Sequence, residues 1–283
     1  MILTEQQLHT IPVFGIAGNF AEHLAQAGEA SDFVNVKTAD ERAPKGLFPI
    51  YIPHCSSFLG VYPVSSDTVA GDFSKPITLQ VEPEICVLFS VEYSQDRRVN
   101  DLKARSFAAF NDCSHRRADA TKISQKKNWG ANSTGVSNQW IEIDQFTGGG
   151  VLDNYHLCSF LKRDGQVFEY GIDSPAVGYN YFYRQLIDWM IDTFNNQTDF
   201  GPLENLSALM AQADYPNQII VTLGATRYTE FGESGYLQPD DQIGIFVYDA
   251  NQTSKSQIEA RFAANDLFTQ FAGSALIQHV VKS

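Results

Sequence analysis

The chain has 283 residues, a length that fits one large domain or two small ones. Hydrophobic residues make up 43% of the sequence and aromatic residues 12%, which is ample for a packed core. The formal net charge of -13 argues against nucleic acid or an anionic membrane as a partner, because both bind basic surfaces. No apolar run reaches the roughly 20 residues of a membrane span, and no signal peptide is visible at the N-terminus.

The N-terminal part predicts a short strand at residues 11–16, followed by a helix at 19–28. Asn19 can cap this helix and Gly28 can end it, and apolar side chains recur at helical spacing between them. Residues 35–76 are rich in Pro, Ser and Gly, and they predict an ordered loop region with minor strands.

The rest of the chain alternates apolar runs with turn signals, which predicts a mainly β protein. A helix fits residues 179–195, where an apolar stripe recurs at helical spacing, and a short helix fits LENLSALMAQA. We therefore expect an α+β fold, mainly β, in a single domain. The stripe comprises Phe182, Leu186, Trp189, Met190 and Phe194. Strands are expected at 77–81, 84–91, 105–110, 139–146, 156–162, 166–171, 218–223 and 242–248.

The four cysteines show no CxxC or CxxxxC spacing, so a zinc site built on them is the less favoured alternative. Most of them lie in strand-like or ordered contexts, where free thiols behave as small buried hydrophobes. Such usage is typical of a reducing compartment, and we expect a cytoplasmic protein. These residues are Cys55, Cys86, Cys113 and Cys158.

Two carboxylates stand at the head of the predicted strand in VEPEICVLFSVEY, residues 81–93. Successive side chains on a strand point to opposite faces, so Glu82 and Glu84 share a face that continues with Cys86. The simpler alternative is a half-buried strand with two solvated acids. However, apolar side chains continue the acidic face, and like charges that enter a buried face need a bound cation to neutralise them.

A third carboxylate, Asp112, follows the strand predicted at 105–110, in the segment NDCSHRR. An Asp at the end of a strand is most often a turn residue. Beside Glu82 and Glu84, it would instead complete an oxygen-rich site. Such a site suits Mg2+, Mn2+ or Ca2+ better than zinc.

Five segments, in order along the chain, resemble motifs of the fumarylacetoacetate hydrolase superfamily. EPEICVLF is similar to its E-x-E-[LI]-x-V-V-I strand, and NDCSHRR is similar to its N-D-x-[ST]-x-R segment. KNWG is similar to K-x-F-[DG], and GNFAEHLAQAG is similar to the lid segment G-x-N-Y-x-x-H-x-x-E. VTLGATRYTEFGESGYLQPDDQIGIFV resembles the T-G-T turn followed by F-L-x-P-G-D-x-V. Together the five segments span residues 15–248.

The resemblance implies a mixed β-roll with a short N-terminal lid helix and one long helix, built as a single catalytic domain over residues 1–283. Residues 1–50 would form the lid region, and residues 75–250 would form the metal-binding core. The resemblance also implies a homodimer, because family members commonly form dimers. It assigns the divalent cation to Glu82, Glu84 and Asp112.

By the same resemblance, the substrate is a small 2-keto or 1,3-dicarbonyl acid. His23 matches the lid base that activates a water, and Lys127 matches a lysine that stabilises the enolate left by carbon–carbon bond cleavage. Arg116 matches a residue that contacts substrate oxygens, and Thr226 is the nearest match to another. Taken alone, His23 would be a solvent-facing helix histidine, and Lys127 would be a surface lysine.

Gln26 stands where the family lid has a glutamate, which is the main departure from the motifs. An amide can orient the imidazole of His23, but it cannot stabilise an imidazolium as a carboxylate does. The sequence therefore predicts that Gln26→Glu raises hydrolysis. Hydrolytic carbon–carbon cleavage is the leading interpretation, with decarboxylation or hydration of a 2-keto acid as the alternative. A noncatalytic, metal-dependent keto-acid-binding protein is the rival from another class.

Overall fold

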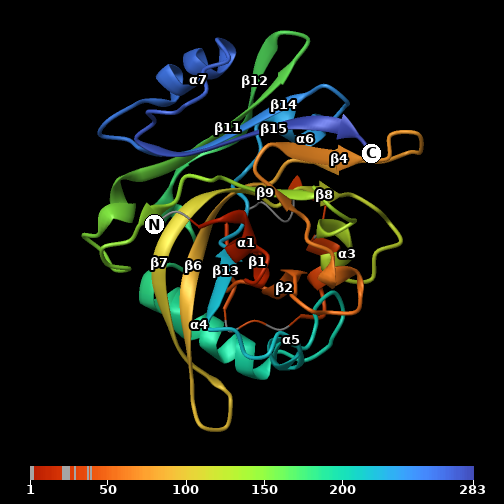
Figure 1. Cartoon of the computed structure of the whole chain (residues 1–283), viewed down its shortest axis with the longest axis vertical. Coiled ribbons are helices and arrows are strands. Elements are labelled where there is room, and N and C mark those ends of the chain that lie inside the picture. The colour runs from red at the N-terminus through yellow and green to blue at the C-terminus, as the bar shows by residue number, and fades with distance from the viewer. Residues whose placement is uncertain (1–2, 21–25, 29, 37, 39) are drawn as a thin grey trace.

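The computed structural model describes residues 3–20, 26–28, 30–36, 38 and 40–283. Within these residues the strands form two large sheets and one small sheet, so the predicted α+β, mainly β fold is confirmed. Figure 1 shows the larger sheet in the lower half of the view and the second sheet above it.

The larger sheet has eight strands within the described residues. In order across the sheet they are β2 (Gly46–Tyr51), β1 (Val13–Ala17), β13 (Gln218–Thr222), β6 (Pro83–Tyr93), β7 (Val99–Asn111), β9 (Thr134–Val136) and β3 (Val64–Ser65), and β10 (Ile141–Glu142) pairs with β7. The long antiparallel strands β6 and β7 bow along one side of the molecule in Figure 1. Strand β1 runs parallel to β13, so the N-terminal part of the chain is built into the same sheet as β6.

The second sheet lies above the first sheet in Figure 1 and contacts strands β6 and β7. Its order is β12 (Gln166–Pro175), β11 (Tyr155–Arg163), β14 (Gln242–Asp249), β15 (Gly273–Lys282) and β4 (Thr68–Gly71). Strands β5 (Leu79–Gln80) and β8 (Ser114–His115) form a separate antiparallel pair.

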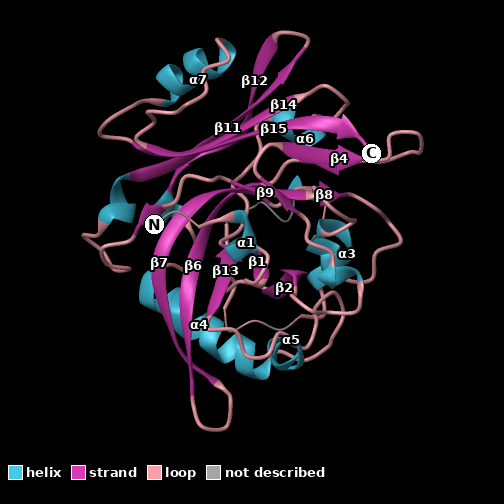
Figure 2. Ribbon diagram, viewed as in Figure 1, coloured by secondary structure: helices cyan, strands magenta, loops and turns pink. Residues whose placement is uncertain are grey.

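The helices are mostly short and lie outside the sheets (Figure 2). The longest, α4, lies beside α5 at the lower end of the view, and α7 lies at the upper end. The described helices are α1 (Glu5–Leu8), α3 (Ser124–Lys127), α4 (Tyr183–Asn196), α5 (Leu206–Gln212), α6 (Glu230–Ser234) and α7 (Lys255–Ala263). The 3-10 turns are η1 (Ala30–Phe33), η2 (Phe58–Gly60), η3 (Val151–Asn154) and η4 (Ala176–Gly178).

Strand β6 is buried on both faces, and each face packs against a different hydrophobic cluster. Ile85 and Val87 belong to a cluster that extends into the second sheet, for example to Leu157 of β11. Cys86 and Leu88 belong to a second cluster on the opposite face. The face that carries the two glutamates is therefore closed to bulk solvent, as the apolar residues that follow them in the sequence indicate.

The predicted stripe of helix α4 packs inward. Leu186 and Phe194 are buried, and the half-buried Trp189 packs against the same cluster. The ring of Phe194 meets that of Phe14 in β1 edge-on, with the ring centroids 5.1 Å apart. The helix begins later than the sequence predicts, because the residue before Tyr183 has an extended backbone with φ -145°.

Some elements differ from the sequence prediction. The strand expected at 139–146 is reduced to β10, because bends and turns occupy the chain from residue 144 to residue 150. Helix α7 and strand β15 are additions that the sequence patterns did not predict. The helix expected at 19–28 falls largely on residues 21–25, which lie outside the described residues.

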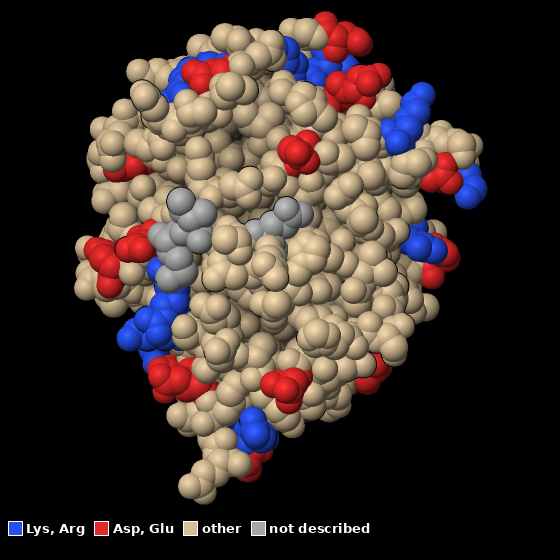
Figure 3. All heavy atoms as spheres, viewed as in Figure 1, with Lys and Arg blue, Asp and Glu red and all other residues tan. Residues whose placement is uncertain are grey.

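Among the described residues, no helix is both long and apolar enough to cross a membrane. On the face shown in Figure 3, charged side chains of both signs lie mainly around the edge, and the centre of the face is largely uncharged.

Candidate metal centre

The three predicted acidic ligands meet where strands β6 and β7 end side by side. Glu82 directly precedes β6, Glu84 is its second residue, and Asp112 directly follows β7. The two strands pair Pro83 with Asn111, and the Asp112 N–H donates to the Glu82 carbonyl at 3.0 Å. All three carboxylates are buried, and one oxygen of each lies within 4.8 Å of one oxygen of the others.

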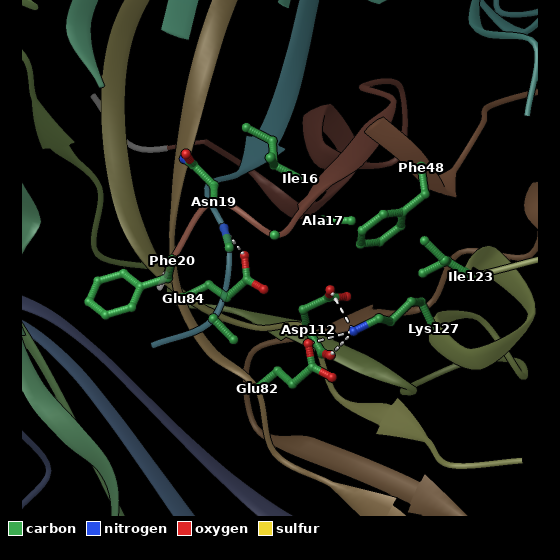
Figure 4. A pocket seen from close by; sticks show the side chains of 13 residues that line it. Ile16, Ala17, Asn19, Phe20, Phe48, Glu82, Glu84, Asp112, Ile123 and Lys127 are labelled. Carbon is green, nitrogen blue, oxygen red and sulfur yellow. Dashed lines mark hydrogen bonds and ion pairs between the residues drawn. The ribbon is translucent and has the colours of Figure 1, made fainter. Parts of the chain in front are cut away.

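A buried lysine lies against two of these carboxylates. Lys127, at the end of α3, is 1% exposed, and its Nζ lies 2.7 Å from Glu82 Oε2 and 2.8 Å from Asp112 Oδ2. The same ammonium donates to the Asp112 carbonyl at 3.0 Å. Figure 4 shows Lys127 reaching toward the acids from the side of Phe48, whose ring centroid is 5.6 Å from Nζ.

A second positively charged side chain, that of Arg116, pairs with Glu82. The Arg116 guanidinium lies 2.7 Å from Glu82 Oε1. It also donates to Gln80 Oε1 at 2.7 Å and to the Tyr228 hydroxyl at 3.2 Å. Arg116 is not among the described residues that line the cavity, so the structure places it as a partner of Glu82.

Glu84 has a different environment from the other two acids. Its Oε2 accepts a hydrogen bond from the Gly224 N–H at 2.7 Å. Burial, and next the nearby charge of Asp112, raise the pKa of the Glu84 carboxyl well above its usual value. Gly224 has φ +109°, a left-handed conformation that favours glycine. The resemblance to the T-G-T turn is the sequence signal that points to this contact.

A buried amide pair holds the ends of the two acidic strands in register. Asn111 Oδ1 accepts from the Glu82 N–H at 3.3 Å, and Asn111 Nδ2 donates to Gln278 Oε1 at 2.9 Å. Gln278, in β15, is fully buried and donates from Nε2 to the Thr68 carbonyl at 3.1 Å. The spacing of the acids therefore depends on a residue of the second sheet, which no sequence motif indicated.

A cavity of about 20 Å³ lies directly over the acids. Four charged side chains form one side of it, and the opposite side is mainly apolar (Figure 4). The charged residues are Glu82, Glu84, Asp112 and Lys127, and the apolar side includes Ile16, Phe20, Phe48 and Ile123. The sequence motifs did not indicate an apolar side of the cavity, because Ile16, Phe48 and Ile123 lie outside the five motif segments and Phe20 lies in the lid motif without a polar group.

The remaining predicted site residues lie in different places. His23 falls within residues 21–25, outside the described residues. The Gln26 amide contacts Tyr228 and Glu233, and Thr226 is buried with its N–H 3.4 Å from the Pro83 carbonyl. Thr226 is not among the described residues that line the cavity, whereas its neighbour Ala225 is.

The donor set fits a hard divalent cation. Glu82, Glu84 and Asp112 offer only oxygen, the ligand type that Mg2+, Mn2+ and Ca2+ prefer. Three buried carboxylates in one cluster repel one another, and a cation between them would relieve that repulsion. The part of the chain that the structure describes therefore contains a coherent candidate metal centre.

Residues 29–280 match a family of unknown function, DUF5718, and no curated protein matches the chain. A 5-carboxymethyl-2-hydroxymuconate delta-isomerase from Mycobacterium smegmatis has a TM-score of 0.52 and 13% identity, over 96% of this chain and 79% of that chain. A 2-keto-3-deoxy-D-arabinonate dehydratase complexed with magnesium and 2,5-dioxopentanoate has a TM-score of 0.52 and 14% identity, over 99% of this chain and 82% of that chain.

A third solved structure is similar over nearly its whole length. It is a protein from Yersinia pestis CO92 assigned to the fumarylacetoacetate hydrolase family, with a TM-score of 0.52 and 14% identity over 96% of this chain and 94% of that chain. The fold expected from the five sequence segments is thus the fold observed. The chain belongs to the DUF5718 family, and its fold is similar to that of the fumarylacetoacetate hydrolase family protein.

Proposed function

We propose that this chain is a divalent-cation-dependent enzyme that acts on a small 2-keto or 1,3-dicarbonyl acid. The observation that carries the proposal is the buried cluster of Glu82, Glu84 and Asp112, with Lys127 beside it in one cavity. The magnesium and 2,5-dioxopentanoate bound by the dehydratase of the same fold support the choice of cation and substrate class. A cytoplasmic location and a homodimer remain predictions from the sequence.

The proposed cation is Mg2+, with Mn2+ or Ca2+ as alternatives, held by the three carboxylates. When bound, such a cation acts as a Lewis acid and orients neighbouring keto and carboxylate oxygens of a substrate. The Lys127 ammonium would stabilise negative charge that develops on the substrate beside Asp112. Phe48 and Ile123 line the cavity next to Lys127 and would keep bulk water away from it.

Hydrolysis of a carbon–carbon bond is the leading proposal for the reaction. In this scheme His23 takes a proton from the attacking water, and Lys127 stabilises the enolate that remains after cleavage. Substrate contacts for Arg116 and Thr226 are proposed on the resemblance alone. The pairing of Arg116 with Glu82 favours a supporting role for the arginine.

One observation favours a second candidate, which is decarboxylation or hydration of a 2-keto acid within the same superfamily. The Gln26 amide is engaged with Tyr228 and Glu233, and it replaces the acid that assists water activation in the family lid. A reaction that depends mainly on the cation and Lys127 tolerates this replacement. A noncatalytic keto-acid-binding protein is the limiting case, in which no turnover occurs.

The decisive experiment compares wild type with Glu84→Gln in metal binding and in turnover. We expect the melting temperature of wild type to rise with the concentration of Mg2+ or Mn2+. We expect this rise to be largely lost in Glu84→Gln. Glu92→Gln is the matched control, because Glu92 lies on the same strand and is exposed. An equal metal response in wild type and Glu84→Gln would remove Glu84 from the metal site.

Turnover then separates the candidate reactions. An acylpyruvate reports carbon–carbon hydrolysis, and oxaloacetate reports decarboxylation, each measured with Mg2+ and again with a chelator. A binding protein would give saturable heat with a keto acid in calorimetry and no product from either compound.

A further inference from the structure

Gln26 makes contacts that only an amide can make. Its Oε1 accepts from the Tyr228 N–H at 3.0 Å, and its Nε2 donates to the Tyr228 carbonyl at 3.4 Å. The same Nε2 donates to Glu233 Oε1 at 2.8 Å. A carboxamide offers both a donor and an acceptor, whereas an ionised carboxylate only accepts. A glutamate at this position would place its charge against Glu233 and against a main-chain carbonyl.

Tyr228 connects Gln26 to the acidic cluster. Its side chain is 1% exposed, and its hydroxyl donates to the Val81 carbonyl at 3.0 Å. The same hydroxyl accepts from Arg116 Nη2 at 3.2 Å, and Arg116 lies 2.7 Å from Glu82 Oε1. Holding the main chain of Tyr228 therefore helps to fix the position of the guanidinium that neutralises Glu82.

A second route runs from the same segment through Gln80. Gln80 Nε2 donates to the Gly232 carbonyl at 2.9 Å and to the Glu233 carbonyl at 3.3 Å. Its Oε1 accepts from Arg116 Nε at 2.7 Å. Helix α6, which contains Glu233, is thus connected to Arg116 through the Gln80 side chain, and it contacts the Gln26 side chain directly.

We propose that Gln26 is a positioning residue that acts through Tyr228 and Glu233 on Arg116 and Glu82. It takes no part in proton transfer, although it occupies the register of the family's lid acid. The proposal rests on the proposed function because the proposed function makes Glu82 a ligand of the cation. It reverses the expectation from the sequence, because Gln26→Glu should now weaken the site instead of activating it.

The test is a double-mutant cycle of Gln26→Glu and Glu233→Gln, with the metal-free melting temperature and the Kd for Mn2+ as readouts. Gln26→Glu should lower the melting temperature and weaken Mn2+ binding by roughly two- to fivefold, a modest effect because Glu233 is exposed. Glu233→Gln alone should change little. The double variant should recover at least half of both losses, because the amide introduced by Glu233→Gln can donate to the new carboxylate. Glu230→Gln, in the same helix, controls for removal of a nearby charge.

Tyr228→Phe tests the link to Arg116 and keeps the proposal decidable if Gln26→Glu folds poorly. In the phenylalanine background, Gln26→Ala should weaken Mn2+ binding less than it does in wild type, because only the route through Glu233 and Gln80 remains. The proposal would be overturned if the double variant showed no rescue. It would also be overturned if Gln26→Glu left the Mn2+ affinity unchanged and made acylpyruvate turnover faster. If wild type does not bind Mn2+, the proposed function fails. The metal-free melting temperatures then still test the coupling between residues 26 and 233.

Discussion

Lys127 is the residue on which the balance of charge in the buried cluster depends most. Its ammonium lies within 2.8 Å of both Glu82 and Asp112, and its side chain is 2% exposed. Removing one partner of a buried ion pair leaves an uncompensated charge, which costs far more than the pair itself contributes. The effect of a substitution at Lys127 should therefore depend on whether another cation can take over the neutralisation.

We expect Lys127→Met to lower the free energy of unfolding by about 3–5 kcal/mol in the presence of a chelator. Mg2+ or Mn2+ should restore more stability to this variant than it adds to wild type, because the cation then replaces the missing positive charge. Denaturant titrations with chelator and with metal measure both effects. Lys126→Met is the control, since Lys126 pairs with Asp32 nearer the surface and should lose about 1 kcal/mol or less. Similar results for the two variants would contradict this view of Lys127.

At the scale of elements, the short helix α3 is held by the segment that precedes α5. Lys122 Nζ donates to the Leu203 carbonyl at 2.7 Å, and the Ile123 N–H donates to the Pro202 carbonyl at 3.1 Å. Ser124 donates a hydrogen bond to Glu204. Burial raises the pKa of the Glu204 carboxyl from its usual 4.5 to about 7, although the Ser124 hydrogen bond and Lys122 oppose the rise.

This raised pKa predicts a pH-dependent contribution to stability. Between pH 4.5 and about 7 the folded state binds the Glu204 proton more tightly than the unfolded state does. The contribution of Glu204 to the free energy of unfolding is therefore fully present below pH 4.5 and is lost as the pH rises through 7. The free energy of unfolding falls by up to about 1.4 kcal/mol per pH unit in this window. In urea unfolding from pH 5 to pH 8, Glu204→Gln should lack this loss, and Glu92→Gln should retain it. A difference between Glu204→Gln and wild type that is constant with pH would refute the assignment.

The sequence predicted those elements whose pattern is local. The two-residue spacing of Glu82 and Glu84 and the apolar run after them were enough to place both acids on a closed face of β6. Strand β15 was missed because its inward face includes the polar residues Ser274 and Gln278, which are fully buried. This mixture hides the alternation of apolar and polar residues on which a strand prediction depends. The contacts of Gln26 were equally hidden, because they join residues about two hundred positions apart in the chain.

At the scale of the whole molecule, one hydrophobic cluster spans both large sheets. Ile85 of β6, Leu157 of β11 and Ile245 of β14 all belong to it. The sheets therefore share a core, and separating them would expose apolar surface on each. The single domain expected over residues 1–283 remains a prediction, and this shared core supports it.

We expect one cooperative unfolding transition that all probes report together. Trp189 of α4 reports the first sheet, and Trp129, whose Nε1 donates to the Ala70 carbonyl at 2.9 Å, reports strand β4 of the second. Variants in which Trp129 or Trp189 is the one tryptophan, with Trp140 also replaced, should give the same midpoint by fluorescence as by far-ultraviolet circular dichroism. Two separated midpoints, or two separately stable fragments after limited proteolysis, would show instead that the sheets fold as independent units.

The hydrogen bond between Asn111 and Gln278 has a consequence for the order of events during synthesis. A growing chain that has reached Lys127 already contains all three acids and the ammonium that neutralises two of them. It still lacks strand β15, whose Gln278 fixes the amide between the acidic strands. More than a hundred further residues must be translated before that partner exists, so the acidic cluster is completed late. Nascent chains that stop before residue 273 contain the paired strands β6 and β7 but lack the Gln278 amide that Asn111 contacts, so one of the hydrogen bonds that position the acids forms only when synthesis is nearly complete.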